Sequence, residues 1–383
     1  MNHLPQKLFL ILFLGATSLL SMAQVPRSSH VWLITEENHS YEQATQAMPY
    51  LMSMANQYGL ATQSYADMHN SLSTLMHLTT GQTVTNNDNT TLYFNVDNIV
   101  RHLMGAGLTW RSYQESIPYA GFEGIGAYPY VKRHDPLAYF TDTNTSAQRI
   151  HAVPQPANFA TAPEVNFSYV TPNLLHDAHD GTMAAADSWL KSHLPAILAR
   201  PEFQPGGDGL MIITFDEGNL SPIDFRCSAT TSSSAGNGCG GRILTVLIGP
   251  HVRRGFRSAT WHNHESVLKT VCMSLGLSGC PGTAATALPM SEFFASGYVK
   301  ILSPLLGTVM QAGHAFTFQA QTVDPFHPVS AMKVYVDNRN VYTTFSGFVD
   351  TALTLAAGTH NVVVNAWDSS GALFQTRQSI TAK

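Results

Sequence analysis

Short apolar runs alternate with amphipathic helical patterns along the chain as far as about residue 290. The runs at residues 31–35, 167–170, 210–215 and 243–248 are bounded by polar residues, which indicates buried strands. Helical patterns lie at residues 71–80, 182–198 and 265–275. Strands that alternate with helices predict an α/β sandwich with a largely parallel sheet.

The pattern changes near residues 295–299. Beyond this point, short segments of alternating polarity predict strands at residues 315–319, 332–336, 353–355 and 361–367. We therefore expect an α/β domain over residues 24–295, followed by a small all-β sandwich over residues 298–383.

The N-terminus has the features of a secretory signal peptide. Lys7 precedes an apolar run over residues 8–20, and Ser21-Met22-Ala23 supplies the small residues that signal peptidase prefers. We expect residues 1–23 to be removed and the mature chain to be secreted or periplasmic. No later apolar run approaches the roughly 18 residues of a membrane span, so no stable membrane insertion is expected.

Because the mature chain is expected to be exported, its four cysteines are expected to form disulfides, which persist in oxidising compartments. Of the three possible connectivities we favour the two local pairs, Cys227–Cys239 and Cys272–Cys280. Neither pair has C-x-x-C spacing, which argues against a thioredoxin-like redox site and a zinc ribbon. The formal net charge of −5 provides no basic field, so no nucleic-acid partner is expected.

Acidic residues follow two of the predicted strands. Glu37 and Asn38 come after the first strand, and Asp216 and Glu217 come directly after the strand at residues 210–215. Because parallel strands present their carboxyl ends at one edge of a sheet, these side chains are expected to converge. Clustered carboxylates repel one another unless a cation lies among them, so we predict a divalent metal ion held by these four residues.

Ser71 opens the helix predicted at residues 71–80. At a helix start, backbone N–H groups and the helix dipole favour an anion, which makes Ser71 a candidate metal-bound nucleophile toward phosphorus. The alternative is that Ser71 only caps the helix.

Seventeen histidines stand against twenty Lys plus Arg, and several lie near predicted strand ends. His176-Asp177 and His179-Asp180 follow the strand at residues 167–170, and His264 precedes a helix. Imidazoles so placed can ligate a metal, bind phosphate or protonate a leaving oxygen, while Asp180 or Thr182 caps a helix. We expect His264 to close the site from the opposite side; its alternative is a polar loop residue.

Together, these motifs resemble a known family: the secreted phosphoesterases that include bacterial acid phosphatases and phospholipases C, related to the alkaline phosphatase superfamily. The resemblance spans nearly the whole predicted α/β domain. The matching stretches are Glu37-Asn38-His39-Ser40-Tyr41, His69-Asn70-Ser71, Lys132-Arg133-His134-Asp135-Pro136, Pro172-Asn173 through His179-Asp180-Gly181-Thr182, Asp187-Ser188-Trp189-Leu190, Thr214-Phe215-Asp216-Glu217-Gly218, Gly241-Arg242 with Gly249-Pro250-His251-Val252, and Asn263-His264 with Leu268.

The resemblance implies an alkaline-phosphatase-like α/β/α sandwich and a phosphoserine mechanism. Ser71 would attack phosphorus, and a divalent metal ion of unspecified identity would neutralise the phosphoryl oxygens. The implied metal ligands are Glu37, Asn38, Ser71, Asp216 and Glu217. The imidazoles implied to bind phosphate and to supply a general acid are those of His69, His134, His179 and His264, with Asp177 orienting one of them.

The tail resembles bacterial immunoglobulin-like domains appended to secreted enzymes. The resemblance lies in Ile301-Leu302-Ser303-Pro304, Val334-Tyr335-Val336-Asp337, Gly358-Thr359-His360-Asn361-Val362 and Ala366-Trp367-Asp368. It implies a spacer, or a module that binds carbohydrate or a cell surface, and no catalytic residue.

The chain also departs from the family pattern. Members often have His-Pro-Ser-x-Pro-Asn at the nucleophile, whereas this chain has His69-Asn70-Ser71-Leu72-Ser73-Thr74. Threonine reaches less far than asparagine toward a phosphoryl oxygen, which predicts reduced or altered activity. His176 is also unusual at its position, so a second metal site remains an open alternative.

Three functions are compatible with this sequence. The leading hypothesis is a phosphomonoesterase of acid-phosphatase type that acts on small phosphoesters. The second is a phospholipase C that cleaves phosphocholine-type head groups, held in a choline cage made by aromatic residues. The third is a non-catalytic surface-binding protein, which the full set of metal-ligand candidates disfavours. The cage residues would be Tyr113, Tyr119, Phe122, Tyr128 and Tyr130.

Overall fold

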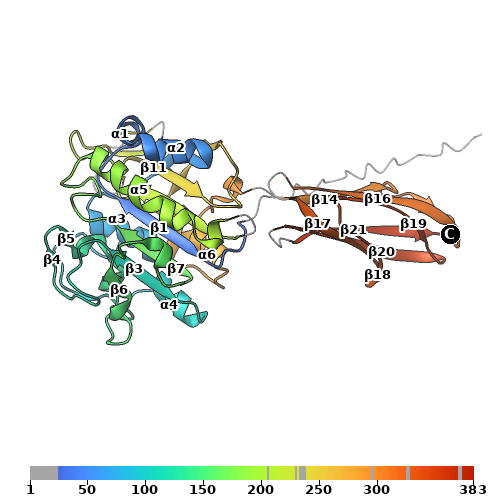
Figure 1. The fold of residues 1–383 in the computed structure, drawn as a ribbon, viewed down its shortest axis with the longest axis horizontal. Coiled ribbons are helices and arrows are strands. Elements are labelled where there is room, and N and C mark those ends of the chain that lie inside the picture. The colour runs from blue at the N-terminus through green and yellow to red at the C-terminus, as the bar shows by residue number, and fades with distance from the viewer. Residues whose placement is uncertain are drawn as a thin grey trace, which may run out of the picture.

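The computed structural model describes residues 25–204, 207–228, 231–232, 239–294, 297–324, 328–369 and 373–383. The predicted signal peptide, residues 1–23, lies outside these ranges. Figure 1 shows an α/β part and an all-β part as two bodies. Of the helices described, none is long and apolar enough to cross a membrane.

A nine-stranded sheet forms the centre of the α/β part, in the order β12-β2-β11-β8-β1-β7-β3-β6, with β13 also paired to β2. All neighbours pair in parallel except at β11, which is antiparallel to both β2 and β8. The strands are β1 (Val31–Glu36), β2 (Gly59–Tyr65), β3 (Trp110–Gln114), β6 (Ala152–Pro154), β7 (Phe167–Thr171), β8 (Leu210–Phe215), β11 (Arg242–Ile248), β12 (Phe256–Ser258) and β13 (His262–Asn263). The predicted largely parallel sheet is confirmed.

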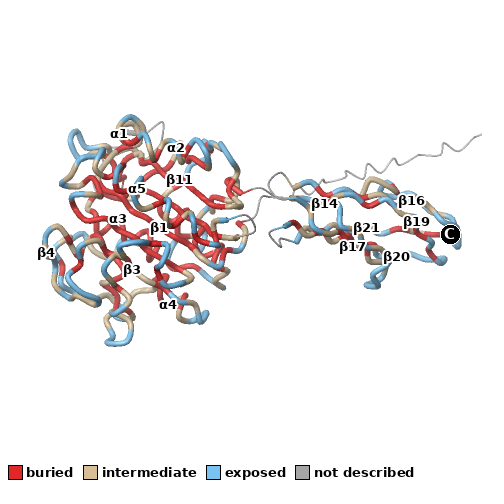
Figure 2. Tube along the Cα trace, viewed as in Figure 1, coloured by how far each residue is buried: buried red, intermediate tan, exposed pale blue. Residues whose placement is uncertain are grey.

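Helices cover both faces of this sheet. Alternate residues of β1 enter two different cores: Val31 and Leu33 lie in one, and Trp32 and Ile34 in the other. The first core also contains apolar residues of α3 (Ser71–Thr80), α4 (Ile99–Gly105) and α6 (His264–Ser274). The second contains those of α1 (Tyr41–Ala47), α2 (Pro49–Gln57) and α5 (Met183–Leu198). The result is three layers, whose buried centre is red in Figure 2.

Loops and two small hairpins complete the α/β part. The hairpins are formed by β4 (Gly126–Ala127) with β5 (Tyr130–Val131), and by β9 (Arg226–Ser228) with β10 (Thr231–Ser232). The cysteine pairs Cys227–Cys239 and Cys272–Cys280 are both disulfides, as predicted. The first lies in the loop after β8, and the second joins the end of α6 to the segment that follows it.

The tail contains two antiparallel-rich sheets, ordered β14-β16-β19 and β15-β21-β20-β17-β18. They enclose a separate core that includes Phe318, Met332, Val334 and Val364. Among the described residues, the apolar cores of the α/β part end at Phe294 and the tail core begins at Val299. The strands are β14 (Tyr298–Ser303), β15 (Val309–Met310), β16 (Ala315–Val323), β17 (Val329–Val336), β18 (Arg339–Thr344), β19 (Phe348–Thr354), β20 (Gly358–Asp368) and β21 (Leu373–Ala382).

A buried acid, Asp135, lies where the loop after β5 meets the sheet. Its carboxylate accepts a hydrogen bond from Ser112 Oγ on β3 at 2.8 Å, and the residue is fully buried. Burial raises the pKa of Asp135 to about 7. Asp135 is therefore neutral in the folded protein at pH 5 and charged at pH 8, whereas in the unfolded chain it is charged at both.

Because the pKa of Asp135 is raised by folding, its ionisation costs stability as the pH rises through the range from about 4 to 7. We expect Asp135→Asn, which cannot ionise, to gain on the order of 2–4 kcal/mol in unfolding free energy relative to the parent between pH 5 and pH 8. Denaturant melts at both pH values measure this difference. The exposed Asp350→Asn is the control and should show none; equal differences for both variants would contradict the assignment.

We propose that the α/β part and the tail are separate domains, because each has its own apolar core. A chain ending at Phe294 should then unfold cooperatively at a temperature within a few degrees of the corresponding transition of the full chain. Calorimetry of the full chain, of the shortened chain and of residues 297–383 alone measures these transitions. An aggregated or unfolded shortened chain would instead mean that the tail is an integral layer.

Candidate functional site

Two adjacent parallel strands place acidic side chains together at their carboxyl ends. β1 and β8 pair in register up to Glu36 and Phe215, so the residues that follow each strand emerge side by side. The backbone N–H of Asn38 donates to Asp216 Oδ1 at 2.8 Å, and the N–H of Glu217 donates to the same oxygen at 2.6 Å. Asn38 adopts a left-handed conformation with φ of 51°, which turns the chain toward β8. Glu37, Asn38, Asp216 and Glu217 therefore converge.

Ser71 lies at the first position of α3 and is 4% exposed. Its Oγ donates to Glu37 Oε2 at 3.0 Å. The N-cap position belongs to Asn70, so the Ser71 hydroxyl contacts the acidic group and does not cap the helix. Thr74 donates its hydroxyl to the carbonyl of Met68 at 2.8 Å, so its side chain is engaged with the backbone that precedes α3.

His134 links this group to Asp177. Its Nδ1 lies 3.0 Å from Asp177 Oδ2 and its Nε2 lies 3.3 Å from Glu37 Oε2. Of the two ring nitrogens only Nδ1 forms a hydrogen bond within the described residues, so Nδ1–H is assigned as the donor to Asp177, and Nε2 faces Glu37. Burial lowers the pKa of His134 to about 3 and raises that of Asp177 to about 7. His179 lies beside them, with its ring 5.4 Å from that of His134 and its backbone N–H on Asp177.

His69 approaches from the segment before α3. Its Nδ1 lies 3.2 Å from Glu217 Oε2, and its Nε2 donates to the carbonyl of Asp224 at 2.9 Å. Burial lowers the pKa of His69, but the hydrogen bond and charge of Glu217 outweigh it, so the net shift is upward.

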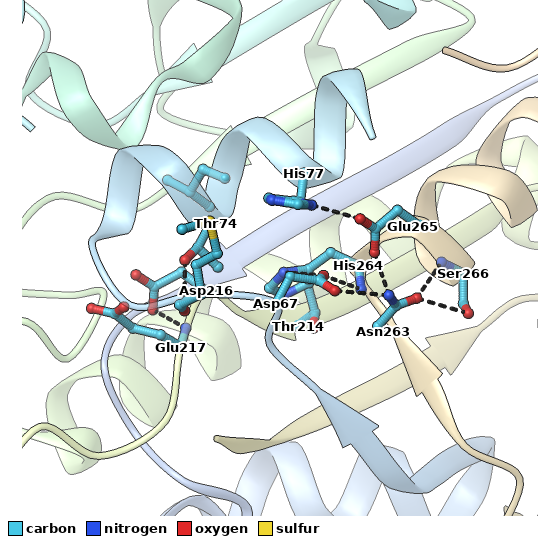
Figure 3. Close-up of polar contacts among 12 residues, drawn as sticks. Asp67, Thr74, His77, Thr214, Asp216, Glu217, Asn263, His264, Glu265 and Ser266 are labelled. Carbon is cyan, nitrogen blue, oxygen red and sulfur yellow. Dashed lines mark hydrogen bonds and ion pairs between the residues drawn. The ribbon is translucent and has the colours of Figure 1, made fainter. Parts of the chain in front are cut away.

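His264 makes different contacts from those of the other imidazoles. It is fully buried at the start of α6, where its Nε2 lies 3.0 Å from the carbonyl oxygen of Phe215 and its Nδ1 lies 3.5 Å from Asp67 Oδ2. Figure 3 shows His264 grouped with Asp67 and Glu265, while Asp216 and Glu217 form a second group. His176 is also apart: it pairs with Glu115 at 2.9 Å, and its side chain is half-exposed.

Sequence analysis missed four acidic or imidazole groups near the strand ends: Glu36, Asp67, His77 and Glu265. Glu36 is fully buried on the face that β1 presents to α5, and burial raises its pKa well above the usual range. Glu36 could be recognised in the sequence as the acid before Glu37, but the others come from three separate places: the segment after β2, α3 and α6. Only the pairing of those elements brings them together.

The acidic group has the properties of a cation site. Burial, followed by the charge of Asp216, raises the pKa of Glu37 well above its usual range, and burial also raises the pKa of Glu217 to about 7. Four buried oxygens of this group have no hydrogen-bond partner within the described part of the chain: Glu37 Oε1, Asn38 Oδ1, Asp216 Oδ2 and Glu217 Oε2, the last of which lies 3.2 Å from His69 Nδ1. No Lys or Arg of that part forms an ion pair with these carboxylates. Buried, clustered oxygen atoms that accept no hydrogen bond are suitable ligands for a divalent cation.

The chain is similar to several phosphatases. It is 29% identical to the phosphatidylinositol-3-phosphatase of Mycobacterium tuberculosis over 280 residues, which are 72% of this chain and 86% of that protein. It is 29% identical over 191 residues to a probable acid phosphatase of Kluyveromyces lactis, and 28% identical over 267 residues to an acid phosphatase of Aspergillus fumigatus. The matched regions cover 46% and 66% of this chain, and 41% and 55% of those proteins, so the chain spans about half the length of these fungal relatives.

Residues 32–278 match the model of the Phosphoesterase family. This match begins in β1 and ends just after α6, so it includes both acidic strand ends, Ser71 and all the imidazoles described above. The predicted resemblance to phosphoesterases is thereby confirmed, as is a hydrolase acting on phosphoric esters. The chain is therefore a member of the Phosphoesterase family.

Proposed function

We propose that the protein is a secreted, metal-dependent phosphomonoesterase of acid-phosphatase type that acts through a phosphoserine intermediate on Ser71. One observation carries the proposal: the buried hydroxyl of Ser71, at the start of α3, lies 3.0 Å from Glu37 Oε2 within a group of carboxylates that fits a cation. Secretion is supported by the N-terminal signal-like segment and the two disulfides.

Ser71 is placed to attack phosphorus. Its hydroxyl proton is directed at Glu37 Oε2, while the N-terminus of α3 favours the negative phosphoryl group. As the Ser71 Oγ–P bond forms, the bond from phosphorus to the leaving oxygen breaks; water then cleaves the Ser71–phosphate ester and restores the hydroxyl. A divalent cation held by Glu37, Asn38, Asp216 and Glu217 supplies charge neutralisation at this position.

The two carboxylate oxygens of Glu37 have separate roles in this proposal. Oε2 accepts the Ser71 hydroxyl and faces His134, whereas Oε1 has no hydrogen-bond partner among the described residues and is the candidate metal ligand. Asp177 holds His134 with its Nε2 toward Glu37 and also positions the backbone of His179. We assign the general acid for the leaving group to the set His69, His134 and His179.

A monoester is the better substrate class than a phosphocholine diester. A dianionic monoester gains more than a monoanionic diester from a cation, a helix N-terminus and several imidazoles. By name, the mycobacterial relative acts on a phosphatidylinositol 3-phosphate, which is a monoester on a lipid head group.

Four of the five aromatic residues that a choline cage would need pack against other rings, whereas Tyr128 is exposed. Tyr113 is buried against Trp32 and Phe159, while Phe122 makes edge-to-face contacts with Tyr119 and Tyr130. Rings that are engaged with one another offer fewer free faces to a cation.

We further propose that the tail is an immunoglobulin-like spacer or a module that binds carbohydrate or a cell surface.

We expect the purified protein, supplied with a divalent ion, to hydrolyse a chromogenic phosphomonoester at least tenfold faster than a phosphocholine diester of the same leaving group. Initial rates on the two substrates, measured side by side, give the ratio. Exhaustive chelation should abolish the monoester activity, and a divalent ion should restore it. Preference for the diester would favour the phospholipase alternative, and activity that survives complete removal of metal would refute metal dependence.

Ser71→Ala should lower kcat on the monoester by at least about a thousandfold, because the attacking oxygen is removed. Loss of one hydrogen bond should cost on the order of 1 kcal/mol of stability, so the variant should remain folded. Ser73→Ala is the matched control: Ser73 is buried two residues further along α3, and its hydroxyl donates to Met68 and Asn86. A folded Ser71→Ala protein that turns over at the rate of Ser73→Ala would disprove the assignment of the nucleophile.

A further inference from the structure

A second cluster of potential metal ligands lies beside the catalytic group. Asp67 follows β2, His77 lies on α3 and Glu265 lies on α6, and one ligand atom from each falls within 4.8 Å of the other two. His77 and Glu265 are buried and Asp67 is half-buried. In Figure 3 these side chains point toward one another and are distinct from Asp216 and Glu217.

The hydrogen bonds of this cluster leave its negative charge incompletely balanced. Asn263 Nδ2 donates to Asp67 Oδ1 at 2.8 Å and also to Glu265, and the backbone N–H of His264 donates to Asp67 Oδ2 at 3.1 Å, so these donors are neutral amides. His77 Nδ1 lies 2.6 Å from Glu265 Oε1. Among the described residues, no Lys or Arg forms an ion pair with either carboxylate. Two adjacent carboxylates, one buried and one half-buried, are stabilised by a proton or a cation between them.

His264 provides an independent observation. Its Nε2 lies 3.0 Å from the carbonyl oxygen of Phe215, which can only accept, so Nε2 carries the proton and Nδ1 presents a lone pair. This Nδ1 is fully buried, has no hydrogen-bond partner in the described part of the chain and faces Asp67 Oδ2 at 3.5 Å. A lone pair directed at a carboxylate is repulsive unless a positive charge lies near both.

We propose that Asp67, His77 and Glu265 bind a second divalent ion, next to the lone pair of His264. This site goes beyond the proposed reaction and does not depend on it. His77 is oriented as a ligand, since its other nitrogen, Nε2, lies 3.1 Å from Thr83 Oγ1 and can donate to it while Nδ1 binds the ion.

The ligand set selects the class of ion. Two carboxylates and at least one imidazole suit Zn²⁺ or Mn²⁺, whereas Ca²⁺ takes roughly six to eight oxygens, more than these residues offer. A metal ion at this site would also link segments that are distant in sequence. Its ligands lie just after β2, on α3 and on α6, near the carboxyl end of β8.

The test is the number of metal ions bound by the full chain. Protein stripped with a chelator is titrated with Zn²⁺ by calorimetry, and elemental analysis follows removal of free ion. The parent should bind two equivalents. Glu265→Gln and His77→Gln should each bind one, with affinity for the lost equivalent reduced at least tenfold. Asp216→Asn, which removes a ligand of the catalytic group, should retain the second-site equivalent.

Glu292→Gln is the matched control. Glu292 also pairs with a buried histidine, His262, at 2.7 Å, but lies outside the cluster, so this variant should keep both equivalents. A parent that binds no ion would overturn the proposal, as would metal content in Glu265→Gln and His77→Gln equal to that of the parent. A parent that binds one ion and loses it in both variants would contradict only the metal ion of the catalytic group. Because the readout is metal content, an inactive enzyme that still binds two ions would contradict only the proposed function.

Discussion

The parallel pairing of β1 with β8 is the constraint on which the rest of the site depends. It holds the segments after Glu36 and Phe215 in register, so that the backbone N–H groups of Asn38 and Glu217 both reach one oxygen of Asp216. Those hydrogen bonds orient Asp216 but do not neutralise the group. The same arrangement that concentrates the oxygen atoms also creates the need for a positive charge among them.

The helices around this edge complete the site in two different ways. α3 brings Ser71 to the acidic group with its first residue and His77 to the second cluster two turns later. α6 begins with His264 and Glu265, and His264 contacts the carbonyl of Phe215, the last residue of β8. One helix thus serves both clusters, and the end of one strand lies between them. Any change in the position of α3 relative to β8 alters both groups together.

Much of this architecture could be predicted from the sequence, because local patterns specify local structure. The apolar runs after residues 30 and 209 identified β1 and β8, the bounds of α3 were predicted as they are observed, and the acids after both strands indicated convergence. The direction of β11 could not be predicted, since an apolar run is the same whether its strand is parallel or antiparallel. β2, β3 and β6 were missed because they are short or mix polar with apolar residues.

The position of His264 shows a second limit of the sequence. The His-Asn-His motif places an imidazole at a helix start, but only the pairing of β13 with β2 determines that its ring contacts Asp67. The same holds for His77, which is one of ten buried residues on α3 and has no motif around it. Residues from distant segments become a site through tertiary packing, which a single sequence does not encode in any local pattern.

The left-handed backbone of Asn38 restricts that position in two ways at once. Glycine would accept the φ of 51° but would remove the amide oxygen, and glutamine would keep the amide but would strain the backbone. Aspartate tolerates the conformation but would add another negative charge beside Glu37, Asp216 and Glu217. Asparagine alone combines the backbone tolerance, the oxygen donor and the neutral charge, so this position has almost no room to vary while the site is kept.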